Sequence, residues 1–313
     1  FEVFASRRWG WNIDPTQLKL ASDVGVATVE FLRANLKPGD RVVVTSPVYS
    51  GFYEWLKELS IEPFDVPLVQ LDEPFSLDIA GIEEAFKQGH LTVLLCNPHN
   101  PTGRVFSRKQ LTELAIIAQK YGATVISDEI HAPLSQVTFT PYLSCGPAAE
   151  ETGVCITSAS KAFNLAGLKA AFLLTQSDSM EAKVAKLPAA THFRSSIVGA
   201  FAMAEAFTNC DAWLDSTLRT LAANAEHLLN QLEVHLPSVK SHIPEAGYLA
   251  WLDITELPLS TQDIATKGKV ALVPGLDMGG ENYKNFARLN FGTSSEIISE
   301  GVRRIASALK NAS

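Results

Sequence analysis

Lys161 stands where a lysine could do covalent chemistry. It follows small and hydroxyl residues just after the apolar, strand-like run 154–157, a place that gives a lysine little structural purpose. Asn100 and Asp128 follow or end two earlier apolar runs in the same way. An amine, a carboxylate and an amide suit the aldehyde, the ring nitrogen and the phenolic oxygen of pyridoxal phosphate. These residues predict a pyridoxal-phosphate site.

Each of the three residues also has an ordinary structural explanation. Lys161 could lie on the surface at a helix start, Asp128 could cap the next helix, and Asn100 lies in a turn rich in Asn-Pro pairs. A cofactor site is the favoured interpretation, because Asp128 ends an apolar run, where an unpaired carboxylate would be costly. Opposite the ring nitrogen, that carboxylate would keep the nitrogen protonated.

Further candidates surround this set. Tyr49 could stack on the ring or be a core aromatic, and Arg288 could bind a carboxylate with its planar guanidinium or be an edge-strand arginine. The Ser158 hydroxyl could bind the phosphate. Val24 and Gly25 open a helical pattern, so their backbone N–H groups could bind an anion at a helix N-terminus.

Short apolar runs alternate with helical patterns through the first half of the chain. The pattern predicts buried strands at 41–45, 91–96, 123–127, 154–157 and 170–174. A helix is predicted between the second and third, with a capping box at Ser107 and Gln110 and a stop at Gly122. Alternation of this kind predicts a mostly parallel sheet, whose ligands bind beyond the carboxyl ends of the strands.

The character of the sequence changes after about residue 193. Helical patterns at 198–207 and 210–235 precede strand candidates at 249–253 and 287–291 and a helix at 300–310. We therefore predict an α/β protein with a large domain, residues 20–205, that carries the mostly parallel sheet. Residues 1–19 and 206–313 are predicted to form a smaller α/β domain.

Composition narrows the function classes. The 313 residues carry a net charge of −8, from 26 basic and 34 acidic residues, which argues against a nucleic-acid surface. No apolar stretch approaches the roughly 20 residues of a membrane helix. The four cysteines lack CxxC spacing, so we expect free thiols, no metal site and a reducing cytoplasm. The start of the chain is neither a signal peptide nor an initiator methionine, and we expect further residues upstream.

Taken together, these motifs resemble the fold-type I pyridoxal-phosphate family, the class I/II aminotransferase superfamily. The resemblance covers about residues 9–308. The stretches 127–131 (SDEIH) and 157–168 (TSASKAFNLAGL) are most similar to the MalY/PatB subgroup of cystathionine β-lyases and related C–S lyases. His131 supports that subgroup, since aspartate aminotransferases typically carry a tyrosine there, and the resemblance makes it a cofactor-binding residue.

The resemblance implies a role for each candidate. It makes Lys161 the Schiff-base lysine, Asp128 the ring-nitrogen partner and Asn100 the phenolate partner. By the same resemblance, Tyr49 stacks on the ring, Ser158 binds the phosphate and Arg288 anchors the substrate α-carboxylate.

The chain departs from the family pattern in two places. Lys169 stands where many relatives have a phosphate-binding arginine, and a lysine cannot form a bidentate fork. The family's N-terminal arm, which contributes a tyrosine to the neighbouring subunit of a homodimer, is absent from this sequence.

The expected activity is β-elimination from a cystathionine- or cysteine-type amino acid, giving a thiol, pyruvate and ammonia. Two alternatives stay open. An aminotransferase would share the early steps and then return the proton to the cofactor. A regulatory protein could bind the cofactor on the same scaffold without turnover. A homodimer with the active site at the subunit interface is also implied, and a membrane partner is not expected.

Overall fold

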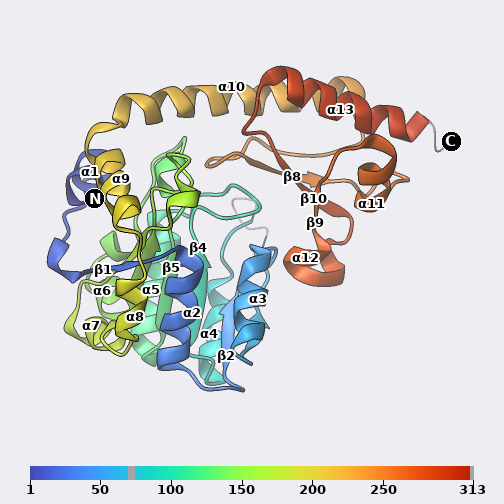
Figure 1. The fold of residues 1–313 in the computed structure, drawn as a ribbon. Helices are drawn as coiled ribbons and strands as arrows, with labels where there is room; N and C mark the ends of the chain where they lie inside the picture. Colours follow the sequence, from blue (N-terminus) through green and yellow to red (C-terminus); the bar gives the residue numbers. More distant parts are fainter. Residues whose placement is uncertain (70–74, 311–313) are drawn as a thin grey trace.

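The computed structural model describes residues 1–69 and 75–310. Its two sheets lie at opposite ends of a long helix, α10 (Asp211–His235), which crosses the top of the molecule in Figure 1. The larger sheet has seven strands and the smaller one has three. Among the described residues, no helix is both long and apolar enough to span a bilayer.

The larger sheet is mostly parallel, as predicted. Its strand order is β1-β7-β6-β5-β4-β2-β3; β2 to β6 pair in parallel, whereas β7 runs antiparallel to both β6 and β1. The strands are β1 (Leu18–Ala21), β2 (Arg41–Val44), β3 (Glu62–Asp65), β4 (Thr92–Cys96), β5 (Thr124–Asp128), β6 (Gly153–Thr157) and β7 (Ala171–Leu174).

Alternate residues of these strands enter two separate cores, because successive side chains point to opposite faces. Val42 and Val44 of β2 pack with helices α2 (Val24–Asn35), α3 (Ser50–Glu58) and α7 (Asp178–Val184). Val43 packs with α4 (Ile79–Lys87), α5 (Arg108–Tyr121) and α6 (Pro147–Thr152) on the other face. Helices therefore cover both faces, and the polar edge at the strand ends is left for a ligand.

Helix α5 confirms its predicted boundaries. The Ser107 hydroxyl accepts from the Gln110 amide, the Gln110 side chain accepts from the Ser107 amide, and Gly122 ends the helix in the left-handed conformation, φ 66°. The helix connects β4 to β5, and the parallel pairing of these two strands brings Asn100 and Asp128 to the same edge of the sheet.

The smaller sheet is antiparallel, in the order β8-β10-β9. Two of its strands match the predicted ones within one residue, and the last helix begins at residue 295 rather than 300. Its elements are β8 (Leu249–Asp253), α11 (Thr261–Asp263), β9 (Val273–Pro274), α12 (Leu276–Gly279), β10 (Phe286–Asn290) and α13 (Ser295–Lys310).

The N-terminal residues correct one part of the predicted domain division. Residues 1–19 were expected with the smaller domain, but α1 (Glu2–Trp9) contacts α9 (Ile197–Asn209), and β1 joins the larger sheet. Aromatic packing explains the placement, because the Phe1 ring lies 4.8 Å from Phe172 and 5.0 Å from Phe207. The boundary near residue 205 stays a prediction.

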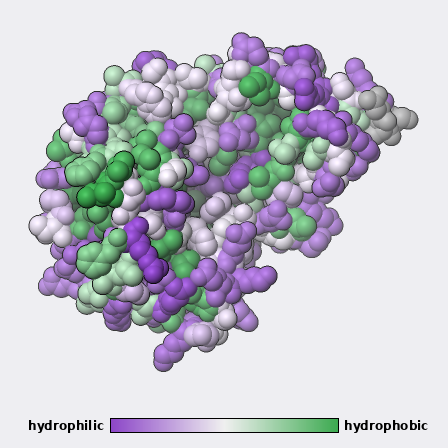
Figure 2. All heavy atoms as spheres, viewed as in Figure 1, coloured by the Kyte–Doolittle hydropathy of each residue, from purple (hydrophilic) through white to green (hydrophobic). Residues whose placement is uncertain are grey.

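A patch of exposed apolar side chains lies on α8 (Ala189–Phe193) and α9, on the left of Figure 2, where green residues gather. Its members are Phe193, Ile197, Val198 and Phe201, with exposed fractions of 86%, 71%, 64% and 71%. We refer to these residues as the α8–α9 patch. An exposed cluster of this kind is unusual on a monomer surface.

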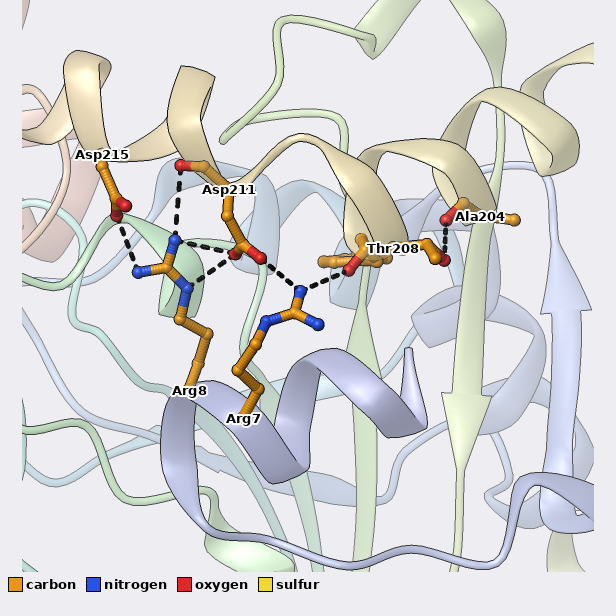
Figure 3. A network of polar contacts seen from close by, with 7 residues as sticks. Arg7, Arg8, Ala204, Thr208, Asp211 and Asp215 are labelled. Atoms are coloured by element: carbon orange, nitrogen blue, oxygen red, sulfur yellow. Dashed lines mark hydrogen bonds and ion pairs between the residues drawn. The ribbon is translucent and has the colours of Figure 1, made fainter.

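Two arginines of α1 join it to the start of α10 (Figure 3). Arg8 donates from Nε to Asp211, at 2.8 Å, and from Nη1 to Asp215, at 2.7 Å. Arg7 lies 2.6 Å from the other Asp211 oxygen. All four side chains are partly exposed, so these ion pairs orient α1 more than they stabilise the fold.

Candidate active site

Eight of the ten predicted site residues line one cavity of about 310 Å³ at the carboxyl end of the larger sheet. Asp128 ends β5, Asn100 follows β4, and Lys161 follows β6. The strand order makes β4, β5 and β6 direct neighbours, which is why residues distant in sequence meet here. The eight are Val24, Gly25, Tyr49, Asn100, Asp128, His131, Lys161 and Lys169.

Asp128 is buried in the wall of this cavity. Its Oδ1 accepts a hydrogen bond from the Ile130 amide at 3.1 Å, and the residue is 5% exposed. Burial raises the pKa of Asp128 to about 7, while the Ile130 bond and the charge of Lys161 act in the opposite direction. A carboxylate in this environment gains from a cationic partner.

His131 lies beside Asp128 as a neutral imidazole. Burial, with the nearby charges of Lys161 and Arg288, lowers its pKa to about 3. Its Nδ1 is buried without a hydrogen-bond partner in the described part of the chain, and its ring meets Tyr248 edge-on at 6.0 Å. A neutral ring adds no charge next to Asp128, so the carboxylate stays available to a ligand.

Arg288 reaches the same region from the smaller sheet. Its Nη1 donates to the Asn100 Oδ1 at 2.9 Å, which connects β10 to the loop after β4. Burial lowers the pKa of Arg288 from its ordinary value, and the neighbouring Tyr49 and Tyr248 oppose that shift. Arg288 does not line the 310 Å³ cavity itself, but this bond places it at the rim beside Asn100.

The N-terminus of α2 forms the other end of the cavity. Val24 and Gly25 are its first residues, and the first amides of a helix have no carbonyl in a preceding turn to bond. The Trp55 indole packs against Gly25, where an added Cβ would lie 2.9 Å from Cζ2. Gly25 therefore permits the close approach of α3 to this helix end.

Ser158 is placed differently from the predicted phosphate ligand. Its hydroxyl donates to the Ala170 carbonyl at 2.6 Å and accepts from the Ser160 amide at 3.0 Å, and the residue does not line the cavity. The turn after β6 points Ser160 into the cavity instead. Ser158 thus holds the lysine-bearing loop, and Ser160 is the hydroxyl on the cavity wall.

Several residues that line the cavity were not among the predicted ones. Asp23 caps α2, a position where aspartate is common, and this preference could have revealed it. Trp55 lies on the helix that follows Tyr49, and the two rings meet at 5.8 Å. Cys96 ends β4 and Ile130 follows β5, and neither had a distinguishing pattern, because the sequence does not show to which side such residues point.

Lys161 also borders a second cavity of about 690 Å³, which lies between α10 and the smaller sheet. Hydroxyl and amide side chains dominate its wall, and Lys161 is the one charged residue among the described residues that line it. The α10 contribution is Trp213, Ser216, Thr217, Thr220, Leu221 and Asn224. Lys161 can therefore face a ligand in the first cavity and a larger group in the second.

Comparison with known proteins identifies the family. Residues 4–305 match the family described as aminotransferase class I and II. The chain belongs to this family. Cystathionine β-lyase PatB of Bacillus subtilis is 34% identical, with 96% of this chain and 80% of PatB aligned. Cystathionine β-lyase of Corynebacterium glutamicum is also 34% identical, over 98% of this chain and 82% of the relative.

The fold of the family is confirmed as well. Cystalysin from Treponema denticola, whose crystal structure contains pyridoxal 5′-phosphate, superimposes with a TM-score of 0.94 over 100% of this chain and 81% of cystalysin, at 24% identity. The predicted fold class and the resemblance to the MalY/PatB subgroup of the class I/II family agree with these findings.

Proposed function

We propose that this chain is a pyridoxal-phosphate-dependent carbon–sulfur lyase, which splits cystathionine- or cysteine-type amino acids into a thiol, pyruvate and ammonia. The observation that carries the proposal is the placement of Lys161, Asp128 and Asn100 around one cavity, with Arg288 at its rim. Relatives at 34% identity are named cystathionine β-lyases, which supports this reaction.

The residues present fit pyridoxal phosphate. Asp128 offers a buried carboxylate with a raised pKa, which suits a protonated ring nitrogen, and Lys161 offers an amine on the same cavity. The free amides at the start of α2 suit a phosphate. When bound, the cofactor supplies an aldehyde for the substrate amine and a ring that withdraws electrons from Cα.

The protein side chains then have separate tasks. Arg288 binds the substrate α-carboxylate, and Asn100, already bonded to it, aligns the guanidinium. The Lys161 amine takes the proton from the substrate Cα, which permits the thiolate to leave Cβ. With the cofactor bound, Asp128 would hold a proton on the ring nitrogen, and Tyr49, on the wall of the same cavity, would help to hold the ring.

The second cavity gives room for the sulfur-bearing side chain. It adjoins Lys161, and its wall of Ser, Thr and Asn side chains suits a polar substituent without a strong charge preference. Substrates with large groups on sulfur should therefore be accepted, because the cavity of about 690 Å³ exceeds the one that suits the cofactor.

Product analysis tests this function. Purified holoenzyme is incubated with cystathionine, with and without a keto acid. Pyruvate and ammonia formed without the keto acid support the lyase. Amino transfer that requires the keto acid would instead favour an aminotransferase, and cofactor binding without turnover would favour a regulatory protein.

The proposed assembly is a homodimer that covers the α8–α9 patch. Val198 of the patch and Val234 of α10 are each 64% exposed, so they form a matched pair. Val198→Asp should produce monomers in sedimentation experiments, because a charge would be buried in the interface. Val234→Asp should leave the dimer intact. If both variants sediment as dimers, the α8–α9 patch is not the dimer interface.

The proposed location is the cytoplasm. All four cysteines are free thiols, of which Cys96 and Cys155 are buried, and reducing compartments favour that state.

A further inference from the structure

Asp23 places a negative charge at the end of the cavity that suits the phosphate. Its Oδ1 accepts from the Val26 amide at 2.8 Å, and its Oδ2 lies 3.3 Å from the Lys169 ammonium. Asp23 and Lys169 both line the cavity beside Val24 and Gly25. The carboxylate thus engages both the helix end and Lys169 on the cavity wall.

The charge of Asp23 is not needed for its structural task. An N-cap residue accepts a hydrogen bond from an amide of the first turn, and asparagine does this as well as aspartate. The positive end of the helix dipole attracts any anion, so a carboxylate here competes with a phosphate for the same partial charge.

Lys169 is held in an unusual backbone conformation. Its φ of 53° lies in the left-handed region, and its carbonyl accepts from the Ser196 amide at 3.1 Å. Non-glycine residues in that region cost free energy and persist only where surrounding contacts hold them. The result is an ammonium directed to Asp23 at the edge of the cavity.

The same cavity shows a second sign of a ligand site. Asp128 is 5% exposed and lines the cavity, and the one hydrogen bond of its carboxylate among the described residues is the one that Oδ1 accepts from the Ile130 amide. The phosphate end and the ring end therefore belong to one ligand site, not to an isolated helix terminus.

We propose that Asp23 is an affinity-setting residue for phosphate monoesters: it competes with the cofactor's phosphate for Lys169 and for the N-terminus of α2. The proposal rests on the proposed function, because it concerns the same cofactor. As a consequence, this enzyme binds pyridoxal phosphate less tightly than Lys169 and the amides of α2 would permit without Asp23. Pyridoxal lacks the phosphate, so its binding should not depend on Asp23.

The experiment titrates the apoenzyme with pyridoxal phosphate and with pyridoxal, and follows protein fluorescence and cofactor absorbance. Asp23→Asn keeps the cap and removes the charge. Asp78→Asn is the matched control, because Asp78 caps α4 by accepting from the Gly81 amide at 2.9 Å and does not line the cavity. Inorganic phosphate is titrated as a competitor of pyridoxal phosphate.

The expected result is that Asp23→Asn lowers the Kd for pyridoxal phosphate about tenfold at low ionic strength, since the lost repulsion is between partly exposed charges. Inorganic phosphate should compete more strongly in that variant, pyridoxal should bind as in the parent, and about 1 M salt should shrink the difference. Asp78→Asn should match the parent throughout.

Two results would overturn the proposal. If the parent binds pyridoxal phosphate but Asp23→Asn binds it no more tightly, or changes both vitamers equally, the competition does not exist while the proposed function stands. If the parent binds neither vitamer, the proposed function fails as well.

Discussion

The two ends of the cavity handle charge in different ways. At the ring end, Asp128 is 5% exposed and its pKa is raised by burial to about 7. At the phosphate end, the side chains of Asp23 and Lys169 are 39% and 61% exposed and form an ion pair. Charges in a buried wall act strongly on a ligand, whereas solvent screens charges at the rim. The rate of the reaction should therefore depend on the ring end, and the affinity for the cofactor on the phosphate end.

Lys161 borders both cavities, and its replacement should have the largest effect. Lys161→Ala should lower kcat for β-elimination by about 10²–10⁴-fold, because the proton acceptor at Cα is lost. Pyruvate release measures the effect. Lys87→Ala, an exposed lysine paired with Glu84, is the control and should retain full activity. Normal turnover by Lys161→Ala would contradict the assigned site.

Asp128→Asn tests the ring end. The variant keeps the shape of the side chain but cannot hold the ring nitrogen protonated, so kcat should fall by about 100-fold. Cofactor absorbance should show that pyridoxal phosphate still binds. Asp14→Asn, which alters an exposed cap far along the chain, should leave kcat unchanged. Equal kcat values for Asp128→Asn and the parent would mean that the buried charge at the ring end does not assist the reaction.

Arg288→Lys tests the rim beside Asn100. A lysine keeps the charge but loses the paired N–H donors, so kcat/KM should fall by about 10- to 100-fold, mainly through KM. Steady-state kinetics with cystathionine separate the two constants. Arg41→Lys, at an exposed ion pair with Glu62, serves as the control. A loss confined to kcat would argue against carboxylate binding by Arg288.

The stability of the apoenzyme should report the buried carboxylate. The pKa of Asp128 is raised from 3.8 to about 7, so its neutral form stabilises the fold at low pH. That contribution is lost as pH rises through about 7. His131 acts with the opposite sign, since its pKa is lowered to about 3 and its contribution is lost as pH falls.

Asp128→Asn isolates the first effect. Urea unfolding from pH 4 to pH 7, a range set by the two Asp128 pKa values, should show the parent losing stability relative to the variant. A constant difference across that range would mean that Asp128 is not protonated in the folded apoenzyme.

The smallest effect is expected at the exposed pairs of α1. Arg8→Ala removes the bonds to Asp211 and Asp215 and should lower the free energy of unfolding by less than about 1 kcal/mol. The loss should shrink in high salt. A larger, salt-independent loss would show that solvent does not screen these partly exposed ion pairs, here or at the phosphate end of the cavity.

Five of the seven strands of the larger sheet could be predicted from the sequence, because they are apolar on both faces and end at polar residues. Strands β1 and β3 were not predicted, because most of their residues are partly or fully exposed. The position of the site could be predicted from the same strands. Parallel neighbouring strands bring their carboxyl ends together, and Asp128 and Asn100 lie at such ends. The helix of the Ser107 capping box was predictable for a local reason, since both of its bonds lie within four residues.

Other features depend on long-range packing or on local rotation of the chain. The position of Phe1 depends on Phe172 and Phe207, which lie far along the sequence. Ser158 and Ser160 are chemically equal, and only the turn after β6 decides that Ser160 faces the cavity. Asp23 could have been found as the N-cap of α2, but its pairing with Lys169, 146 residues further along the sequence, could not.

Reductive trapping shows which lysine carries the cofactor. The holoenzyme is treated with borohydride, which fixes pyridoxal phosphate on the amine that carries it, and the labelled peptide is sequenced by mass spectrometry. The label should be found on Lys161, and Lys161→Ala should remain unlabelled. A label on Lys169 or any other lysine, or none at all, would mean that Lys161 does not carry the cofactor.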